Sequence, residues 1–205
     1  MKNLLQDKKF VVIDDVISEW LQNEILKMLD SNTFDWYYYK NTVYPESHFF
    51  KKYKNVTNLI DTPQFVHRFF NIEEADKQEH TSPYLNIPLM LLNEFCLKKE
   101  VKLLRLIRAK ANLMLPSKKS NVNTHSMPHK DQDTSHYVIL YYVNDSDGDT
   151  FLFDDDGKTF ARISPKKGRC LVFDGNILHA SSNPIESEVR LIMNIDLAHE
   201  DNIYV

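Results

Sequence analysis

The residues of this chain whose types and spacing could bind a metal are His129, Asp131 and His179. Side chains two positions apart in an extended strand project to the same face, so the imidazole of His129 and the carboxylate of Asp131 can hold one ion. His179 comes much later in the chain and must reach that ion from a different strand, folded back against the first. Two histidines and one carboxylate on one side of a metal leave coordination positions open, which is typical of non-haem Fe(II) oxygenases.

The His-x-acid triplet by itself is weak evidence. With 8 His and 29 acidic residues among 205, chance supplies about one such triplet per chain. A second match, His199-Glu200-Asp201, lies near the end of the chain with no later His or Arg, and we interpret it as a solvated tail. The case for a metal site therefore depends on the elements that surround the first triplet.

Composition limits the classes of protein that this chain can be. A length of 205 residues predicts one domain, 1–205, and 42% hydrophobic with 26% charged residues is ordinary for a soluble globular protein. A net charge of −4 without a long basic run disfavours nucleic acid as a partner. The first residues lack the apolar core of a signal peptide and no stretch has the length of a membrane span, so we expect a cytoplasmic protein. Cys96 and Cys170 have no CxxC spacing and are expected to be reduced.

The first hundred residues predict a helical support with a few strands. Residues 10–13 form a β-branched run, and 16–29 then carry apolar residues at helical spacing. Residues 64–70 and 84–99 are interpreted as further helices. The aromatic residues of 33–57 are assigned to sheet and core packing, with a substrate-stacking surface as the alternative.

From residue 101 onward, short strands separated by turns follow one another, which favours a sandwich or jelly roll over alternating βαβ units. The predicted strands are 101–115, 136–143, 151–153, 159–163, 169–173 and 188–197. The acidic turn at 154–157 is interpreted as a hairpin connection, because a calcium loop would need later acidic ligands. The polar, turn-rich residues 116–128 directly precede the triplet and predict a mobile loop at the mouth of the site.

The last strand alternates in a way that bears on binding. Its apolar face, which should pack on the amino-terminal helices, consists of Val189, Leu191, Met193, Ile195 and Leu197. The opposite face carries Arg190 and Asn194, whose side chains would need partners inside a narrow interior. A bound carboxylate suits a guanidinium, which can bind it through two hydrogen bonds. The alternative is a surface Arg190 paired with Glu186 or Glu188.

Taken in order, these motifs resemble those of the 2-oxoglutarate/Fe(II)-dependent dioxygenases, most closely the prolyl-4-hydroxylase-like group. The matching segments are 129–131, Tyr-Tyr-Val-Asn at 141–144, Gly-Asp-Thr at 148–150, Pro-Lys-Lys-Gly-Arg at 165–169, Val-Phe-Asp at 172–174, His179 and Arg190. The resemblance covers 101–197 and the opening strand and helix, whereas 40–100 match nothing that we can place. It implies a mainly β fold with α-helices (α+β): a double-stranded β-helix (jelly roll, cupin-like) at 101–197, supported by amino-terminal helices within 1–100.

The resemblance also implies roles for particular residues. His129, Asp131 and His179 would hold Fe(II), and Arg190 would bind the distal carboxylate of the co-substrate 2-oxoglutarate. Tyr142 matches a tyrosine whose hydroxyl shares that carboxylate, and Asn112 resembles an asparagine that contacts the co-substrate in some relatives. The sequence departs from the group's pattern at two places, with Met114 where a tyrosine is frequent and Gly148-Asp149-Thr150 in place of Gly-Gly-Glu-Thr.

The implied activity is hydroxylation of a C–H bond in a protein or peptide side chain or in a small molecule, with O2 consumed and succinate and CO2 released. Ascorbate is an optional reductant of such enzymes. Two alternatives stay open at this point. One is an oxidative demethylase of nucleic acid, which the acidic balance disfavours. The other is a jelly-roll module that binds a metal or a partner without turnover. The sequence leaves the substrate and the oligomeric state open.

Overall fold

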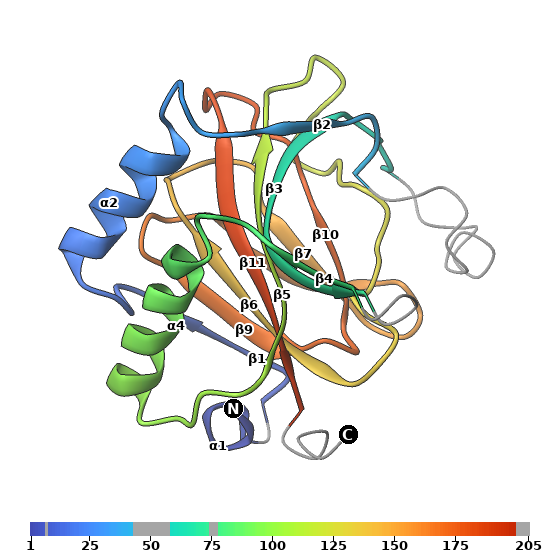
Figure 1. The fold of residues 1–205 in the computed structure, drawn as a ribbon. Coiled ribbons are helices and arrows are strands. Elements are labelled where there is room, and N and C mark those ends of the chain that lie inside the picture. Colours follow the sequence, from blue (N-terminus) through green and yellow to red (C-terminus); the bar gives the residue numbers. More distant parts are fainter. Residues whose placement is uncertain (7, 43–57, 74–77, 200–205) are drawn as a thin grey trace.

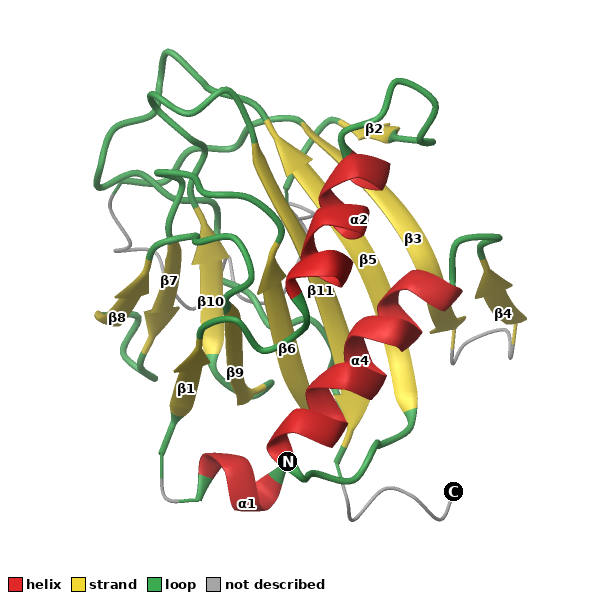
Figure 2. Ribbon diagram, turned by 90° about the vertical axis from the view of Figure 1, so that its left-hand side faces the viewer, coloured by secondary structure: helices red, strands yellow, loops and turns green. Residues whose placement is uncertain are grey.

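The computed structural model describes residues 1–6, 8–42, 58–73 and 78–199. Two antiparallel sheets face each other, and helices cover the outer face of the larger sheet (Figures 1 and 2). The larger sheet has the spatial order β1 (Phe10–Ile13), β9 (Cys170–Asp174), β6 (His136–Tyr142), β11 (Arg190–Ala198), β5 (Leu106–Met114), β3 (Gln64–Glu73) and β2 (Tyr37–Tyr39), with β4 (Gln78–Thr81) paired to β3. The smaller sheet has the order β10 (Leu178–Ser181), β7 (Thr150–Phe153) and β8 (Thr159–Ile163). The helices are α1 (Lys2–Leu5), α2 (Glu19–Leu29) and α4 (Asn86–Lys99).

The strand β6 lies in the middle of three layers, with the helices on one side and the smaller sheet on the other. All of its residues are buried, because each face of the strand packs against a different layer. One set of alternate residues joins the apolar cluster shared with α2 and α4: Tyr137, Ile139 and Tyr141. The other set faces inward against the smaller sheet: Val138, Leu140 and Tyr142. This arrangement is the predicted jelly roll.

The alternation predicted for the last strand is confirmed in β11. Leu191, Met193, Ile195 and Leu197 pack in the outer cluster with residues of α2 and α4. The other side chains point into the interior between the sheets: Arg190, Ile192, Asn194 and Asp196. Because β11 pairs with β5 on one side and β6 on the other, this interior face lies in the middle of the larger sheet.

The amino-terminal end of α2 is hydrogen-bonded to α4. Ser18 caps α2, its hydroxyl accepting from the N–H of Leu21. The same serine donates from its backbone N–H and its hydroxyl to the carboxylate of Glu94 on α4, at 2.6 and 2.9 Å. The helices predicted over 16–29 and 84–99 are therefore confirmed, and none of the helices in the described residues is long and apolar enough to cross a membrane.

The helix predicted at 64–70 is wrong, because these residues belong to β3. The apolar residues Phe65, Val66, Phe69 and Phe70 suit either a helix or a bulged strand. Pairing with β5 decides in favour of the strand, and a register shift between Arg68 and Phe70 lets both Phe69 and Phe70 be buried. Residues 1–100 thus contribute β1, β2, β3 and β4 to the larger sheet.

The aromatic segment divides between core and surface. Phe34 is buried and packs against Trp36 and Phe69, as the core interpretation predicted. Tyr37 and Tyr38 belong to β2, as the sheet interpretation predicted, but each is 61% exposed, so they are not part of the core. Residues 43–57 of the same segment lie outside the described residues.

The predicted hairpin, the two cysteines and the loop at 116–128 can each be compared with the structure. The hairpin of β7 and β8 is confirmed, with Gly157 at a φ of 80° in its turn, and both Cys96 and Cys170 are free and buried. Residues 116–128 form an irregular loop as predicted, but 124–128 are buried, and the N–H of Ser126 donates to the carbonyl of Ser181 at 2.8 Å.

The second His-x-acid match is not simply a solvated tail. The imidazole of His199 stacks on the ring of Tyr137 with centroids 4.8 Å apart, and its Nε2 lies 2.9 Å from the tyrosine hydroxyl. The interpretation as a solvated tail is therefore wrong for His199. Glu200 and Asp201 lie outside the described residues.

Candidate metal centre and adjoining pocket

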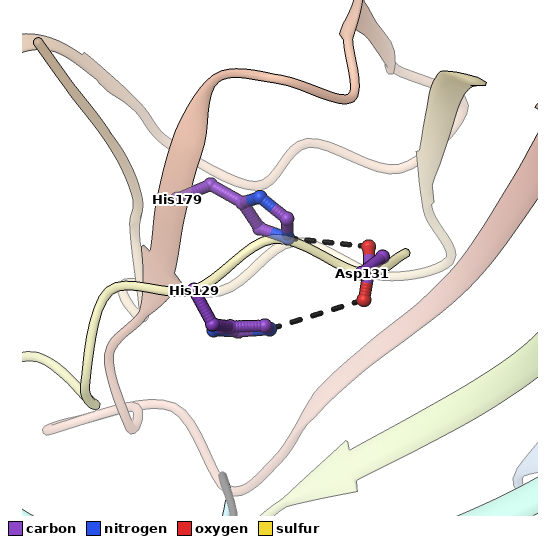
Figure 3. A group of neighbouring side chains, drawn as sticks. All are labelled: His129, Asp131 and His179. Atoms are coloured by element: carbon purple, nitrogen blue, oxygen red, sulfur yellow. Dashed lines mark ion pairs between the residues drawn. The ribbon is translucent and has the colours of Figure 1, made fainter. Parts of the chain in front are cut away.

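His129 and His179 meet because the segment before β6 pairs with β10. Each of the two residues donates its backbone N–H to the carbonyl of the other at 3.0 Å, and the imidazole centroids lie 4.6 Å apart. Asp131 follows His129 by two residues and turns its carboxylate toward both rings (Figure 3). The prediction that His179 reaches the site from a separate strand is confirmed.

The ligand atoms of the three side chains lie within 4.8 Å of one another. Asp131 Oδ2 is 3.3 Å from His179 Nε2, and Asp131 Oδ1 is 3.9 Å from His129 Nε2 (Figure 3). On the opposite side of each ring, Nδ1 lies close to a backbone carbonyl, at 3.1 Å from Met127 and 3.3 Å from Ile177. Because a carbonyl oxygen only accepts, these contacts suit the tautomer with the proton on Nδ1, in which Nε2 has a lone pair for a metal ion.

This donor set fits a divalent transition metal. His179 Nε2 is buried and has no hydrogen-bond partner among the described residues. Burial lowers the pKa of His129 to about 3, and His179 and Lys110 act in the same direction, so the imidazole is neutral at pH 7. Burial raises the pKa of Asp131, but Arg108 and the other nearby cations outweigh burial and hold the pKa well below its usual value. Neutral imidazoles and an ionised carboxylate are the forms that bind metal ions.

The carboxylate of Asp131 is held in place by residues that sequence reasoning missed. Arg108 Nη2 lies 2.5 Å from Oδ1, and Asn194 Nδ2 donates to Oδ2 at 2.9 Å. Arg108 also pairs with Asp196 at 2.9 Å. The signal that could have identified Arg108 is its spacing on β5, which places it on the same face as Asn112.

Lys110 shares that face of β5, and its Nζ lies 3.8 Å from Asp131 Oδ1. Burial and the neighbouring Arg108 lower the pKa of Lys110 to about 8, so its ammonium form predominates at pH 7. The side chain lines the same small cavity as His129 and His179. A cation therefore stands beside the metal-ligand set without being one of the ligands.

Arg190 occupies the other part of this cavity. It is 1% exposed, which contradicts the alternative of a surface ion pair with Glu186 or Glu188. Its Nε donates to the carbonyl of Gly148 at 2.6 Å and its Nη2 to Thr150 Oγ1 at 2.9 Å. Within the described part of the chain it has no carboxylate at ion-pair distance. A buried guanidinium without an anionic partner is costly, by several kcal/mol, which favours a carboxylate ligand.

Thr150 links the predicted residues Arg190 and Tyr142. The hydroxyl of Tyr142 donates to Thr150 Oγ1 at 2.8 Å, so this oxygen accepts from both the phenol and the guanidinium. Burial raises the pKa of Tyr142 to about 12, so the phenol keeps its proton at pH 7. From the sequence, Thr150 was noted only as part of the Gly-Asp-Thr segment at 148–150, with no role at the site, yet its side chain lines the cavity. With both acceptor sites of Oγ1 used, the hydroxyl proton of Thr150 is available for a further acceptor.

Asn112 also lines this cavity. On β5 it lies between Lys110, which is opposite Asn194, and Met114, which is opposite Arg190. Its Nδ2 donates to Gln64 Oε1 at 2.8 Å, and its Oδ1 is buried without a hydrogen-bond partner in the described residues. The cavity has a volume of about 40 Å³.

Solved structures with a similar fold include 2OG-Fe(II) oxygenases. The chain is similar to an oxidoreductase of that family from Burkholderia pseudomallei, with 11% identity, a TM-score of 0.65, and coverage of 96% of this chain and 89% of that one. A prolyl hydroxylase from Trichoplax adhaerens, solved with a peptide fragment of the hypoxia inducible factor oxygen degradation domain, has 14% identity and a TM-score of 0.58 over 95% and 86% of the two chains. The non-heme alpha ketoglutarate dependent epimerase SnoN from nogalamycin biosynthesis has 12% identity and a TM-score of 0.59 over 95% and 79%.

At these identities the similarity shows the fold. No protein-family model and no curated protein sequence matches the chain. The double-stranded β-helix that the sequence motifs predicted is confirmed, and the functional assignment depends on the residues of the site.

Proposed function

We propose that this protein is an Fe(II)- and 2-oxoglutarate-dependent dioxygenase that hydroxylates a C–H bond of a protein or peptide side chain or of a small molecule, releasing succinate and CO2. The observation that carries the proposal is the set of residues that line one cavity. That cavity is lined both by His129 and His179 of the metal-ligand set and by the buried Arg190, which has no carboxylate partner in the described residues.

His129, Asp131 and His179 would hold the iron through Nε2, a carboxylate oxygen and Nε2. Bound iron supplies the activation of O2, with 2-oxoglutarate as the source of two electrons and ascorbate as an optional reductant. The protein's part is to orient the two imidazoles through the carbonyls of Met127 and Ile177. These outer contacts fix the ring positions before the metal arrives.

The distal carboxylate of 2-oxoglutarate would bind to Arg190 and to the hydroxyl proton of Thr150. Tyr142 would act through Thr150, because its own hydroxyl is already bonded to that residue. Asn112 would place its amide beside the middle of the co-substrate, held there by Gln64. This changes the role expected of Tyr142 from direct contact to positioning, and it adds Thr150 to the ligand set.

The substrate class has two candidates. Among the similar structures, the Trichoplax protein is described as a prolyl hydroxylase in complex with a peptide, and SnoN as an epimerase of nogalamycin biosynthesis. Both a peptide and a small molecule are therefore compatible with this architecture. The non-catalytic module remains the alternative of a different class, and turnover distinguishes it from the enzyme.

The proposal is tested by anaerobic titration of the protein with Fe(II) and then 2-oxoglutarate, following the charge-transfer absorption of the ternary complex. Succinate is then measured after air is admitted. Asp131→Ala should abolish iron retention, whereas Arg190→Ala should keep iron and lose the band. Arg169→Ala, which removes an arginine paired with Asp14 at the surface, serves as the matched control. Folded protein that gives neither the band nor succinate would support the non-catalytic module.

A further inference from the structure

Lys110 is a cation of the interior whose charge the proposed function does not use. Its side chain is 19% exposed and lines the cavity that also contains His129 and His179. Its Nζ lies 3.8 Å from Asp131 Oδ1, an ion pair that is longer than a hydrogen bond. The ammonium group thus carries three donors that this part of the protein leaves without a hydrogen bond.

The neighbouring acids are already paired. Asp131 Oδ1 lies 2.5 Å from Arg108, and Asp131 Oδ2 accepts from Asn194. Asp196 accepts from Gln132 at 2.8 Å and pairs with Arg108 at 2.9 Å. A metal bound to Asp131 would withdraw its carboxylate further from Lys110, because the metal competes for the same lone pairs and adds two positive charges.

A second cation lies on the side of Lys110 away from the co-substrate pocket. Lys110 stands opposite Asn194 on β11, and on its other side it stands opposite Arg68 on β3. Directly opposed residues of antiparallel strands share a face, so Arg68 extends the cationic row toward the β2 edge of the sheet. Arg190 lies on the strand β11, on the other side of Lys110 from this row.

We infer that Lys110 binds a carboxylate of the molecule that is oxidised, so the substrate is an acid or a peptide that presents an acidic group near the reacting C–H bond. This inference rests on the proposed function, which accounts for both carboxylates of 2-oxoglutarate: the distal one at Arg190 and the other at the metal. A third carboxylate, from the substrate, would supply a hydrogen-bonded anion, because the ion pair of Lys110 with Asp131 spans 3.8 Å. A hydrogen-bonded ion pair in a mostly buried site contributes both affinity and orientation.

The test measures whether a carboxylate sits near the metal independently of turnover. The protein is loaded with Mn(II), which takes the same imidazole and carboxylate ligands, and is saturated with 2-oxoglutarate. Paramagnetic relaxation of two probes is then followed by NMR: 4-methylpentanoate and its neutral counterpart 4-methylpentanamide. In the wild-type protein, the paramagnetic relaxation enhancement of 4-methylpentanoate should be at least tenfold larger than that of 4-methylpentanamide at equal concentration. Lys110→Met should remove that preference, Lys110→Arg should retain it, and Lys27→Met, a change on the exposed surface of α2, should leave it intact.

The possible results separate the inference from the function on which it rests. The inference is overturned, while the proposed function stands, if the wild-type protein binds Mn(II) and 2-oxoglutarate but relaxes both probes alike. This outcome can be measured without any variant. A loss of 2-oxoglutarate affinity of tenfold or more in Lys110→Met, with the probe preference unchanged, also overturns the inference by assigning Lys110 to the co-substrate. Failure to bind Mn(II) or 2-oxoglutarate at all refutes the proposed function itself.

Discussion

Replacing Thr150 with valine tests whether its hydroxyl stabilises Arg190 and Tyr142 in the ligand-free protein. Valine has nearly the shape of threonine but no hydroxyl, so two donors lose their shared acceptor: Arg190 Nη2 at 2.9 Å and the hydroxyl of Tyr142 at 2.8 Å. A lost hydrogen bond to a charged group costs about 1.5–3 kcal/mol, and a neutral one about 0.5–1.5 kcal/mol. Thr150→Val should therefore reduce the free energy of unfolding by about 2–4 kcal/mol.

Comparison with Tyr142→Phe gives this prediction its sharpest form. The phenylalanine removes one donor but leaves Thr150 bonded to Arg190, so it should cost about 1 kcal/mol. In the double variant no tyrosine hydroxyl is left unpaired, so the total should fall short of the sum of the two single effects by at least about 0.5 kcal/mol. Urea denaturation of the four proteins measures all three values. A loss below about 0.5 kcal/mol for Thr150→Val, or strict additivity, would show that Thr150 does not join the two donors.

Four further predictions concern the metal, the co-substrate and pH. Arg190→Met should retain Fe(II) but weaken the binding free energy of 2-oxoglutarate by about 2–5 kcal/mol in calorimetric titration. An unchanged affinity would contradict the role of Arg190. Asn194→Ala should reduce Fe(II) affinity by about 10–100-fold in competitive metal titration, since it removes a hydrogen bond that orients Asp131; equal affinity would assign that orientation elsewhere. Gly148→Ala should destabilise the protein by about 1–3 kcal/mol in urea, because a Cβ there would lie 2.8 Å from Arg190 Cδ and from the Ser182 carbonyl; a neutral change would mean that the loop adjusts. The pKa of His129 is about 3 in the folded protein and 6.5 in the unfolded chain, so metal-free protein should lose stability as pH falls below 6.5, by at most about 1.4 kcal/mol per pH unit. His129→Gln should flatten that slope in urea denaturation at pH 4–7, and an unchanged slope would assign it to other groups.

The local pattern of the sequence predicted the parts of the site that depend on strand geometry. The two-residue period of β11 separates Arg190 and Asn194 from the apolar residues that pack under the helices, and that separation follows from the pleat alone. The spacing of His129 and Asp131 likewise placed two ligands together. The helix α2 was predicted in a similar way, from the helical spacing of its apolar residues.

Pairings between distant segments decided what the local pattern left open. Residues 64–70 carry a spacing that suits a helix, and only the pairing with β5 makes them a strand. That same larger sheet brings Arg108 and Lys110 of β5 beside Asp131, two contacts that the sequence order does not reveal.

The sequence by itself therefore predicted a sandwich or jelly roll, two histidines and a carboxylate that could share one ion, and an arginine on the interior face of the last strand, because each depends on residue chemistry or on the period of a strand. The tertiary structure alone decided how these residues are connected. Thr150 became the shared partner of Arg190 and Tyr142 because β7, β11 and β6 lie around one cavity. Lys110 was left without a hydrogen bond for a related reason: Arg108 and Asn194, which approach from two strands, already occupy the carboxylate nearest to it.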